Sequence, residues 1–295
     1  MNSGHFKVFR DIAQTHSVSR GAAINGISQS AASQILKHLE NDIGVVLLDR
    51  STRPLKLTPA GRLYFDASRD IVRRYEVMRA EIDSLKGELV GSVRVASIYS
   101  IGLYEMRRIR EDFEEEHPQA RVHLEYMHPE KVYEAVSGDQ ADLGLISYPT
   151  ATKKLKVIPW RIEKMVLVCH PRHRLARKRT VEVNDLADQE FVSFDPDLSI
   201  RKAMDRFFRE RGLLRKVVLA FDNIQMIKEA LVIGSGISLL PERTVRQEVT
   251  EGRLVAHRIE APELVRPVGI VQRRRTTLSP TAAAFLQYLQ ERPGD

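Results

Sequence analysis

The sequence predicts an α/β protein with a helical N-terminal region and a longer C-terminal region in which strands and helices alternate. Its length of 295 residues is enough for two or more domains of usual size. In the first 90 residues the apolar positions recur mainly with helical periodicity, whereas short β-rich runs follow from residue 91. With 43% apolar and 29% charged residues, the composition is typical of a globular, soluble chain.

Basic residues are concentrated at the N-terminus. The formal net charge is +7, and residues 1–62 hold eight Lys or Arg against four acidic residues. More than half of the basic excess therefore lies in this short segment. Such an excess permits a polyanionic partner, although a plain solvated surface is the alternative.

The first 44 residues predict three short helices. The first carries an apolar stripe that begins at Phe6. A cap at Ser17 or Ser19 opens the second, which ends near Gly26, and Ser28 caps the third after a hydrophobic entry residue. Two short helices joined by a tight glycine-containing turn predict a helix-turn-helix.

Two short β-prone runs follow the third helix. Residues 45–48 and 55–57 flank the turn "RSTRP", which predicts a basic hairpin, or wing. In a winged helix the third helix enters the major groove N-terminus first. Its glutamine amides can then contact adenine edges, its hydroxyls can contact phosphates, and the basic side chains supply salt-dependent attraction. The predicted DNA-binding residues are Ser28, Gln29, Ser30, Ser33, Gln34, Lys37, Arg50 and Arg53.

These motifs resemble the N-terminal domain of LysR-type transcriptional regulators. The shared pattern is an aromatic-rich helix, A-A, S-Q-x-A-x-S, L-E, G-x-x-L-x-x-R and L-T-x-A-G, in order over about sixty residues. Two positions depart from it: Ser30 replaces the usual proline and Gln34 the common arginine. The second departure changes one base or phosphate contact but not the expected fold. Residues 1–62 are thus expected to form a winged helix-turn-helix DNA-binding domain.

Residues 63–90 predict a long linker helix. Its apolar residues are spaced alternately four and three positions apart. This is the spacing of a heptad seam, and it implies a partner helix. The alternative is that this helix packs on its own domain. The resemblance to LysR-type regulators implies instead that it dimerises with an antiparallel copy. The predicted seam residues are Ile71, Tyr75, Met78, Ile82, Leu85 and Leu89.

Eight β-rich runs separated mostly by amphipathic helical stretches fill residues 91–295 and predict α/β units with mostly parallel sheets. The resemblance implies an effector-binding domain of periplasmic-binding-protein type with two subdomains. Subdomain I is expected over residues 91–160 and 267–295, and subdomain II over residues 161–266. The two crossovers are expected within residues 148–160 and 261–267.

Ligands of open α/β sheets bind beyond the carboxyl ends of the strands, which predicts a site between the subdomains. Polar residues follow several predicted strands, and three of them, Ser100, Ser199 and Asn223, match the family's effector positions. Helix capping is the alternative role for any one of these residues. The predicted effector-binding residues are Tyr99, Ser100, Ser147, Ser199, Arg201 and Asn223.

Other motifs favour structural roles. The single cysteine, Cys169, excludes an internal disulfide, fits a reducing compartment and is expected at a buried strand end. The N-terminus lacks the apolar core of a signal peptide, and no apolar run is as long as a membrane span, so we expect a cytoplasmic location. Two clusters, residues 172–179 and 273–275, are expected in solvated loops. We expect no metal, no cofactor and no enzyme.

The sequence therefore predicts a DNA-binding transcriptional regulator controlled by a small polar or anionic effector. Its expected partners are double-stranded promoter DNA, further copies of the chain in a homodimer or homotetramer, and RNA polymerase if the protein is an activator. One alternative is a constitutive repressor without an effector. Another is an enzyme or solute-binding protein whose winged helix contacts protein.

Overall fold

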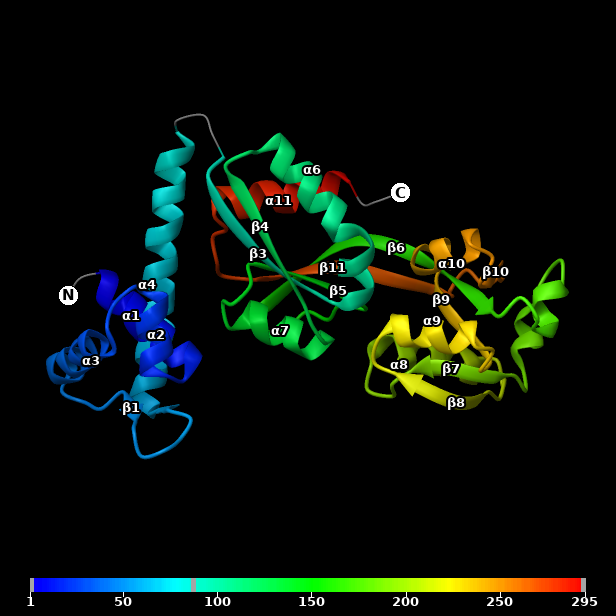
Figure 1. Ribbon diagram of the computed structural model, residues 1–295, viewed down its shortest axis with the longest axis horizontal. Helices are drawn as coiled ribbons and strands as arrows, with labels where there is room; N and C mark the ends of the chain where they lie inside the picture. Colours follow the sequence, from blue (N-terminus) through cyan, green and yellow to red (C-terminus); the bar gives the residue numbers. More distant parts are fainter. Residues whose placement is uncertain (1–2, 86–88, 293–295) are drawn as a thin grey trace. The chain divides into compact units, whose positions relative to one another are not determined.

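The computed structural model describes residues 3–85 and 89–292, which fall into two compact units divided between residues 88 and 89 (Figure 1). The first unit contains helices α1 (Ser3–Thr15), α2 (Val18–Ile24) and α3 (Gln29–Ile43), strands β1 (Leu48–Asp49) and β2 (Lys56–Leu57), and helix α4 (Pro59–Ser84). The predicted winged helix-turn-helix is thereby confirmed.

Local capping sets the helix boundaries of the first unit. The Ser17 hydroxyl accepts a hydrogen bond from the Arg20 amide at 3.3 Å, and the Ser28 hydroxyl accepts one from the Ala31 amide at 3.2 Å. Each bond satisfies a backbone donor that has no partner within its helix. Of the two predicted caps for α2, Ser17 is therefore the one observed.

Glu40 fixes the hairpin to the end of α3. Its Oε1 accepts hydrogen bonds from the amides of Leu47 and Leu48 at 2.9 and 3.3 Å. The hairpin then pairs β1 with β2 in antiparallel register, with Leu48 opposite Leu57. Because Leu36 and Leu39 are buried on the inner face of α3, the opposite face of that helix remains available to solvent.

Helix α4 begins four residues before the predicted start. The Thr58 hydroxyl caps it by accepting from the Gly61 amide at 2.9 Å, and Pro59 occupies the first turn, where its missing N–H costs nothing. The helix ends at Ser84, and residues 86–88 lie outside the described residues. Leu89 packs against an apolar core of the second unit. The predicted extension of the seam to Leu89 is therefore wrong, because helical periodicity was continued past the end of the helix.

The second unit is built on one nine-stranded sheet. Eight strands follow the order β4-β3-β5-β11-β6-β9-β7-β8, and β10 pairs with β6. The strands are β3 (Gly91–Ser97), β4 (Ala120–Tyr126), β5 (Leu143–Ser147), β6 (Leu155–Cys169), β7 (Glu190–Phe194), β8 (Lys216–Phe221), β9 (Ile237–Pro241), β10 (Val255–Arg258) and β11 (Val265–Arg273).

Helices connect these strands and cover the sheet. Figure 1 shows α6 and α11 on one side of β3, β4 and β5, with α7 on the other. The helices of this unit are α5 (Tyr99–Ile101), η1 (Gly102–Met106), α6 (Arg107–Glu116), α7 (Pro129–Ser137), η2 (Arg174–Arg177), η3 (Val183–Leu186), α8 (Ser199–Glu210), α9 (Ile224–Val232), η4 (Glu242–Val245), α10 (Arg246–Thr250) and α11 (Pro280–Glu291).

The crossover strands run antiparallel to their neighbours, which corrects the expectation of mostly parallel sheets. β3 is parallel to β4 and β5, and β7 is parallel to β8 and β9, as α/β units require. By contrast, β11 pairs antiparallel with β5 and β6, and β6 pairs antiparallel with β9 and β10. The long strand β6 therefore joins two parallel sheets into one.

Two apolar cores flank this junction. One is formed by buried residues within 93–160 and 268–289, and the other by buried residues within 165–264. We refer to these two parts of the second unit as subdomain I and subdomain II. Within residues 3–85 and 89–292, no helix is both long and apolar enough to cross a membrane.

Candidate functional site

The start of α3 presents polar side chains to solvent. Ser28, Gln29, Ser30 and Gln34 are exposed, as is Lys37 one turn further along. Ser33, the remaining residue of the predicted set in this helix, is half-buried. The N-terminus of α3 thus combines amides, hydroxyls, one cation and the positive end of the helix dipole, a surface suited to a phosphate backbone and base edges.

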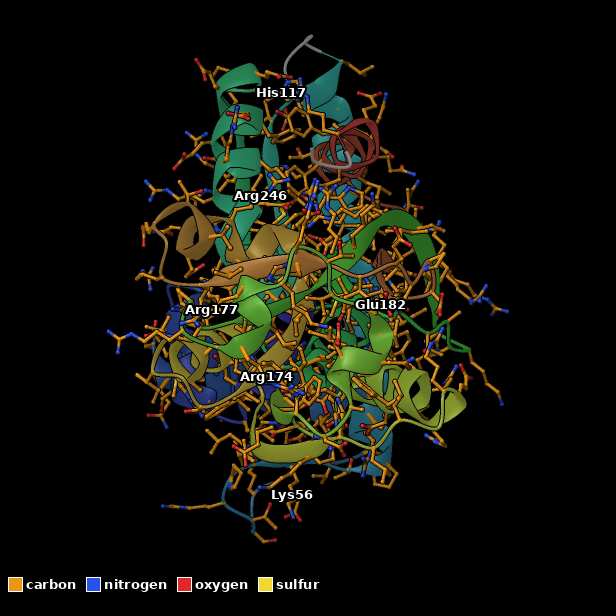
Figure 2. All side chains as sticks on the ribbon, turned by 90° about the vertical axis from the view of Figure 1, so that its right-hand side faces the viewer. Lys56, His117, Arg174, Arg177, Glu182 and Arg246 are labelled. Carbon is orange, nitrogen blue, oxygen red and sulfur yellow. The ribbon has the colours of Figure 1, made fainter. Side chains whose placement is uncertain are left out.

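The two arginines predicted at the wing differ in their surroundings. Arg50 donates to Glu40 Oε2 at 2.9 Å, so its charge is partly offset, whereas Arg53 is exposed at the turn. Lys56 in β2 is also exposed and is labelled in Figure 2. The sequence analysis did not assign Lys56 to the DNA-binding surface. Lys56 lies between the apolar residues Leu55 and Leu57, and in a strand this alternation would have placed it on the solvent face.

In the second unit, a pocket lies where the loops of both subdomains meet. Its walls come from residues at or just after the ends of the parallel strands β3, β4, β5, β7 and β8, together with Arg266 of β11. The cavity measures about 50 Å³, room for about four water-sized groups when roughly 10–15 Å³ is taken for each. Its polar lining consists of Tyr99, Ser100, His128, Ser147, Ser199, Asp222, Asn223 and Arg266. Five of the six predicted effector-binding residues are among them.

Subdomain I places Ser100 at the pocket through an irregular helix. Strand β3 leads into the short helix α5, which contains Tyr99 and Ser100 and continues as the π-helical turn η1. A Cβ at Gly102 would lie 2.1 Å from the Tyr126 ring, so glycine is required for this helix to approach β4. π-Helical turns are frequent at functional sites, and here the turn follows directly after the pocket residues.

Subdomain II contributes two helix starts. Ser199 is the first residue of α8, whose N-cap Leu198 provides no side-chain hydrogen bond. Asn223 caps α9 by accepting from the Met226 amide at 3.0 Å, and its Nδ2 donates to Asp222 at 2.9 Å. Asn223 is therefore both a helix cap and a pocket residue. The sequence analysis had given helix capping as the alternative to a position in the effector pocket.

Arg201 does not line the pocket, so its predicted role in effector binding is corrected. Its Nε donates to both oxygens of Asp205 at 3.0 and 3.1 Å, and its Nη1 donates to the Phe194 carbonyl at 2.8 Å. The guanidinium thus holds α8 against the end of β7. An acid four residues downstream on the same helix was the sequence signal for this role.

The crossover beside Ser147 is held by Tyr148. Its hydroxyl donates to the Val265 carbonyl at 2.9 Å and its amide donates to the Pro267 carbonyl at 2.8 Å. Burial raises the pKa of the Tyr148 phenol to about 12, so it remains neutral and acts as a hydrogen-bond donor. The two crossover segments are therefore joined directly behind the pocket.

Sequence reasoning missed Arg266, the fully buried cation of the pocket lining. Its side chain is 1% exposed, and Nε donates to Glu163 Oε2 at 2.7 Å while Nη1 donates to Ser100 Oγ at 2.8 Å. Desolvation lowers the pKa of Arg266, but a guanidinium keeps its proton in proteins. A positive charge therefore lies at the floor of the pocket.

Arg266 is the buried end of a chain of ion pairs whose other end, Arg243 with Glu105, is partly exposed. Glu163 also accepts from Arg161 Nε at 2.8 Å. Arg161 contacts Glu105 of η1, and Glu105 contacts Arg243 of η4. These five residues carry three positive and two negative charges and connect both subdomains with both crossover strands. We call them the charge chain.

Other chemical groups of the second unit have structural surroundings. Cys169 is fully buried at the end of β6, as predicted, and burial raises the pKa of its thiol to about 11. Figure 2 shows Arg174 and Arg177 of η2, which are exposed in the expected solvated loop. Arg273 is instead buried and paired with Asp139, so that part of the second basic cluster is not a solvated loop.

A winged helix-turn-helix joined to a two-subdomain ligand-binding unit defines an effector-responsive, DNA-binding regulator. Residues 3–62 match the bacterial regulatory helix-turn-helix model of the LysR family, and residues 86–294 match the LysR substrate binding domain. The chain therefore belongs to the family of LysR-type transcriptional regulators, which confirms the resemblance seen in the sequence.

Curated relatives align along nearly the full chain. A RuBisCO operon transcriptional regulator of Allochromatium vinosum is 30% identical, with 96% of this chain and 93% of the relative covered. The transcriptional activator CmpR of Synechocystis is 26% identical over the same shares. The dual regulator GltC of Bacillus subtilis is 27% identical, with 98% and 96% covered.

Solved structures share the fold. Full-length OxyR from Pseudomonas aeruginosa superposes with a TM-score of 0.79 at 20% identity, covering 99% of this chain and 94% of the other. CbnR in complex with its target DNA gives 0.65 at 20% identity over the whole of both chains. The effector-binding domain of QuiR in complex with shikimate gives 0.62 at 18% identity, covering 68% of this chain and 96% of the other.

Proposed function

We propose that the first turns of α3 read promoter DNA and that the wing holds the phosphate backbone. Gln29 and Gln34 would contact base edges, Ser28, Ser30 and Ser33 would contact phosphates, and Lys37, Arg50 and Arg53 would supply counterion release. The exposure of the polar face of α3 supports this assignment, as does the exposed arginine at the hairpin turn. CbnR, which has the same fold, was solved in complex with its target DNA.

We also propose that α4 is the seam of a homodimer, which could associate further into a homotetramer. Ile71, Tyr75, Met78, Ile82 and Leu85 are 40–86% exposed in the single chain. Large apolar side chains at heptad spacing are costly to leave in water, and a second copy of α4 would cover them. If the protein is an activator, RNA polymerase is a further partner.

The pocket between the subdomains is proposed as the effector site, with Tyr99, Ser100, Ser147, Ser199 and Asn223 as its ligand-binding residues. The observation that carries this proposal is that these five side chains come from four different segments, two in each subdomain, yet line one cavity. A small polar or anionic molecule suits the lining, because its hydroxyls can donate hydrogen bonds and Arg266 supplies a positive charge.

Effector binding is proposed to change the relative placement of the subdomains. Ion pairs between the subdomains include Arg243 with Glu105 and His128 with Asp197 at 3.6 Å. A ligand that binds one arrangement more tightly shifts the population toward it. Through the linker helices of a dimer, such a shift would alter the spacing of the recognition helices on DNA.

The test is a promoter-binding titration of the full-length protein in the presence and absence of metabolite pools. We expect specific, salt-dependent binding to its own promoter region, and at least one metabolite fraction that changes the affinity or the footprint. Ser100→Val should keep promoter binding and lose the response. A protein that binds its promoter but responds to no fraction would instead be a constitutive repressor.

A further inference from the structure

Arg266 and Ser100 form a donor pair at the floor of the proposed effector pocket. Ser100 Oγ accepts from Arg266 Nη1 at 2.8 Å, which occupies a lone pair of the hydroxyl. A serine hydroxyl has a single proton to donate, so this bond leaves that proton for a different acceptor. Because Arg266 is charged, it also polarises the hydroxyl and strengthens its donation. An acceptor that carries negative charge suits this pair best.

The surroundings of Arg266 favour a negative ligand rather than a neutral one. The charge chain of Arg266, Glu163, Arg161, Glu105 and Arg243 carries a net charge of one positive. Arg266 and Glu163 lie opposite each other in the antiparallel pair of β11 and β6, and both are almost completely buried. In such a desolvated place a net charge acts with little screening.

A second set of donors faces the same cavity from subdomain II. Helix α8 has 12 residues, and its N-cap Leu198 leaves the first-turn amides without a side-chain partner. Leu198, Ser199 and Ile200 all line the pocket. The start of α8 therefore adds the positive end of a helix dipole to the charge of Arg266. Asp222 also lines the pocket, but it is exposed and already accepts from Asn223 at 2.9 Å.

We propose that the effector is a small oxyanion and that Arg266, acting directly and through Ser100, selects for its negative charge. This inference rests on the proposed effector function of the same pocket and specifies the class of molecule that it takes. The cavity measures only about 50 Å³, so a small ligand suits it. Both short-chain carboxylates and inorganic phosphate or sulfate offer this chemistry.

The primary experiment uses the full-length protein with acetate, lactate, pyruvate, inorganic phosphate and sulfate at constant ionic strength. Acetamide and lactamide serve as neutral counterparts of the first two. Binding is followed by thermal shift and by the fluorescence of Trp160, the single tryptophan of the chain, whose ring lies 4.2 Å from the Arg161 guanidinium of the charge chain. We expect at least one anion to bind at least about tenfold more tightly than a neutral amide. Comparing the affinities of the carboxylates with those of phosphate and sulfate then shows which kind of oxyanion the pocket binds.

Three variants separate charge selection from a structural role. Glu163→Gln removes the carboxylate that offsets Arg266, so we expect anion binding to tighten by about tenfold. The double variant Arg266→Gln with Glu163→Gln leaves the net charge of the charge chain at one positive but takes the cation out of the pocket lining, and Arg161 keeps Glu105 as its partner. The double variant should lose the preference for anions over amides, whereas Arg266→Lys should retain it. A role confined to packing would make all three variants weaken anions and amides equally.

The outcomes distinguish this inference from the function on which it rests. Equal binding of anions and amides, or a double variant that keeps the anion preference, would overturn the selection by Arg266. If a neutral or cationic compound binds the pocket and changes promoter affinity, the effector function stands and the oxyanion inference fails. If no compound of any charge alters promoter binding, the effector function itself is wrong.

Discussion

Gln29 lies exposed in the first turn of α3, where we propose that its amide contacts base edges. Gln29→Ala should cost about 1–3 kcal/mol on the cognate site and spare non-specific binding, because only the base contact is lost. Titrations on cognate and scrambled duplexes measure both values. Lys37→Ala is the matched control, with an expected loss that is uniform across sequences. Equal losses for Gln29→Ala on both duplexes would remove this residue from base recognition.

Lys228 and Glu248 form a buried ion pair in subdomain II. Their side chains are 3% and 4% exposed, and Nζ lies 2.5 Å from Oε1. Glu248→Leu should lower the free energy of unfolding by about 3–5 kcal/mol, since it removes the carboxylate that pairs with a buried ammonium. Lys228→Met combined with Glu248→Leu should restore most of this loss. Denaturant unfolding of the single and double variants is the measurement, and equal stabilities of the two would contradict the argument.

At the scale of elements, the wing is the simplest test of DNA contact. Arg53 is exposed at the hairpin turn, so Arg53→Ala should weaken binding to every DNA sequence. The slope of log affinity against log salt should fall by about one unit, because one fewer counterion is released. Arg108→Ala on α6 is the control and should leave the slope unchanged. An unaltered slope for Arg53→Ala would place the hairpin away from the phosphates.

Helix α4 allows a matching test of assembly. Met78 lies in the exposed apolar stripe and Arg79 lies beside it on the same helix. Met78→Glu places a carboxylate in the proposed seam, where a two-fold axis would bring it near its own copy. Light scattering should then report monomers or aggregates, whereas Arg79→Glu should keep the native oligomer. A native oligomer for Met78→Glu would return α4 to the role of packing on its own domain.

At the scale of the whole molecule, Cys169 reports global opening. The thiol is buried and its pKa is raised to about 11, so at neutral pH a thiol reagent should react only with molecules that open. Above pH 9 the unfolded chain ionises this thiol before the folded chain does, so stability should decline as pH rises toward 11. Thiol-labelling rates with and without denaturant check the first point. Rapid labelling under native conditions would show that the end of β6 is open to solvent.

Sequence patterns predicted the helix-turn-helix, the wing and eight strands of the second unit, because these depend on local capping and periodicity. They did not predict β10, since "VAHR" is short and lacks a clear alternation. The charge of Arg266 was missed for a different reason. Its partner Glu163 lies 103 residues away, so its burial depends on the pairing of two crossover strands. The five pocket residues were found because each lies at or just after the end of a predicted strand, which is a local signal.

The crossover topology also has a consequence for biosynthesis. Strand β5 ends at Ser147, but its neighbour β11 begins only at Val265. At roughly 5–20 residues per second, translation takes on the order of ten seconds to cover that interval. During this time one edge of β5 has no neighbour, and the segments that form the core of subdomain II are complete only at the end of the interval. A nascent chain stalled before β11 would therefore offer chaperones a folded subdomain II beside an apolar, half-built sheet.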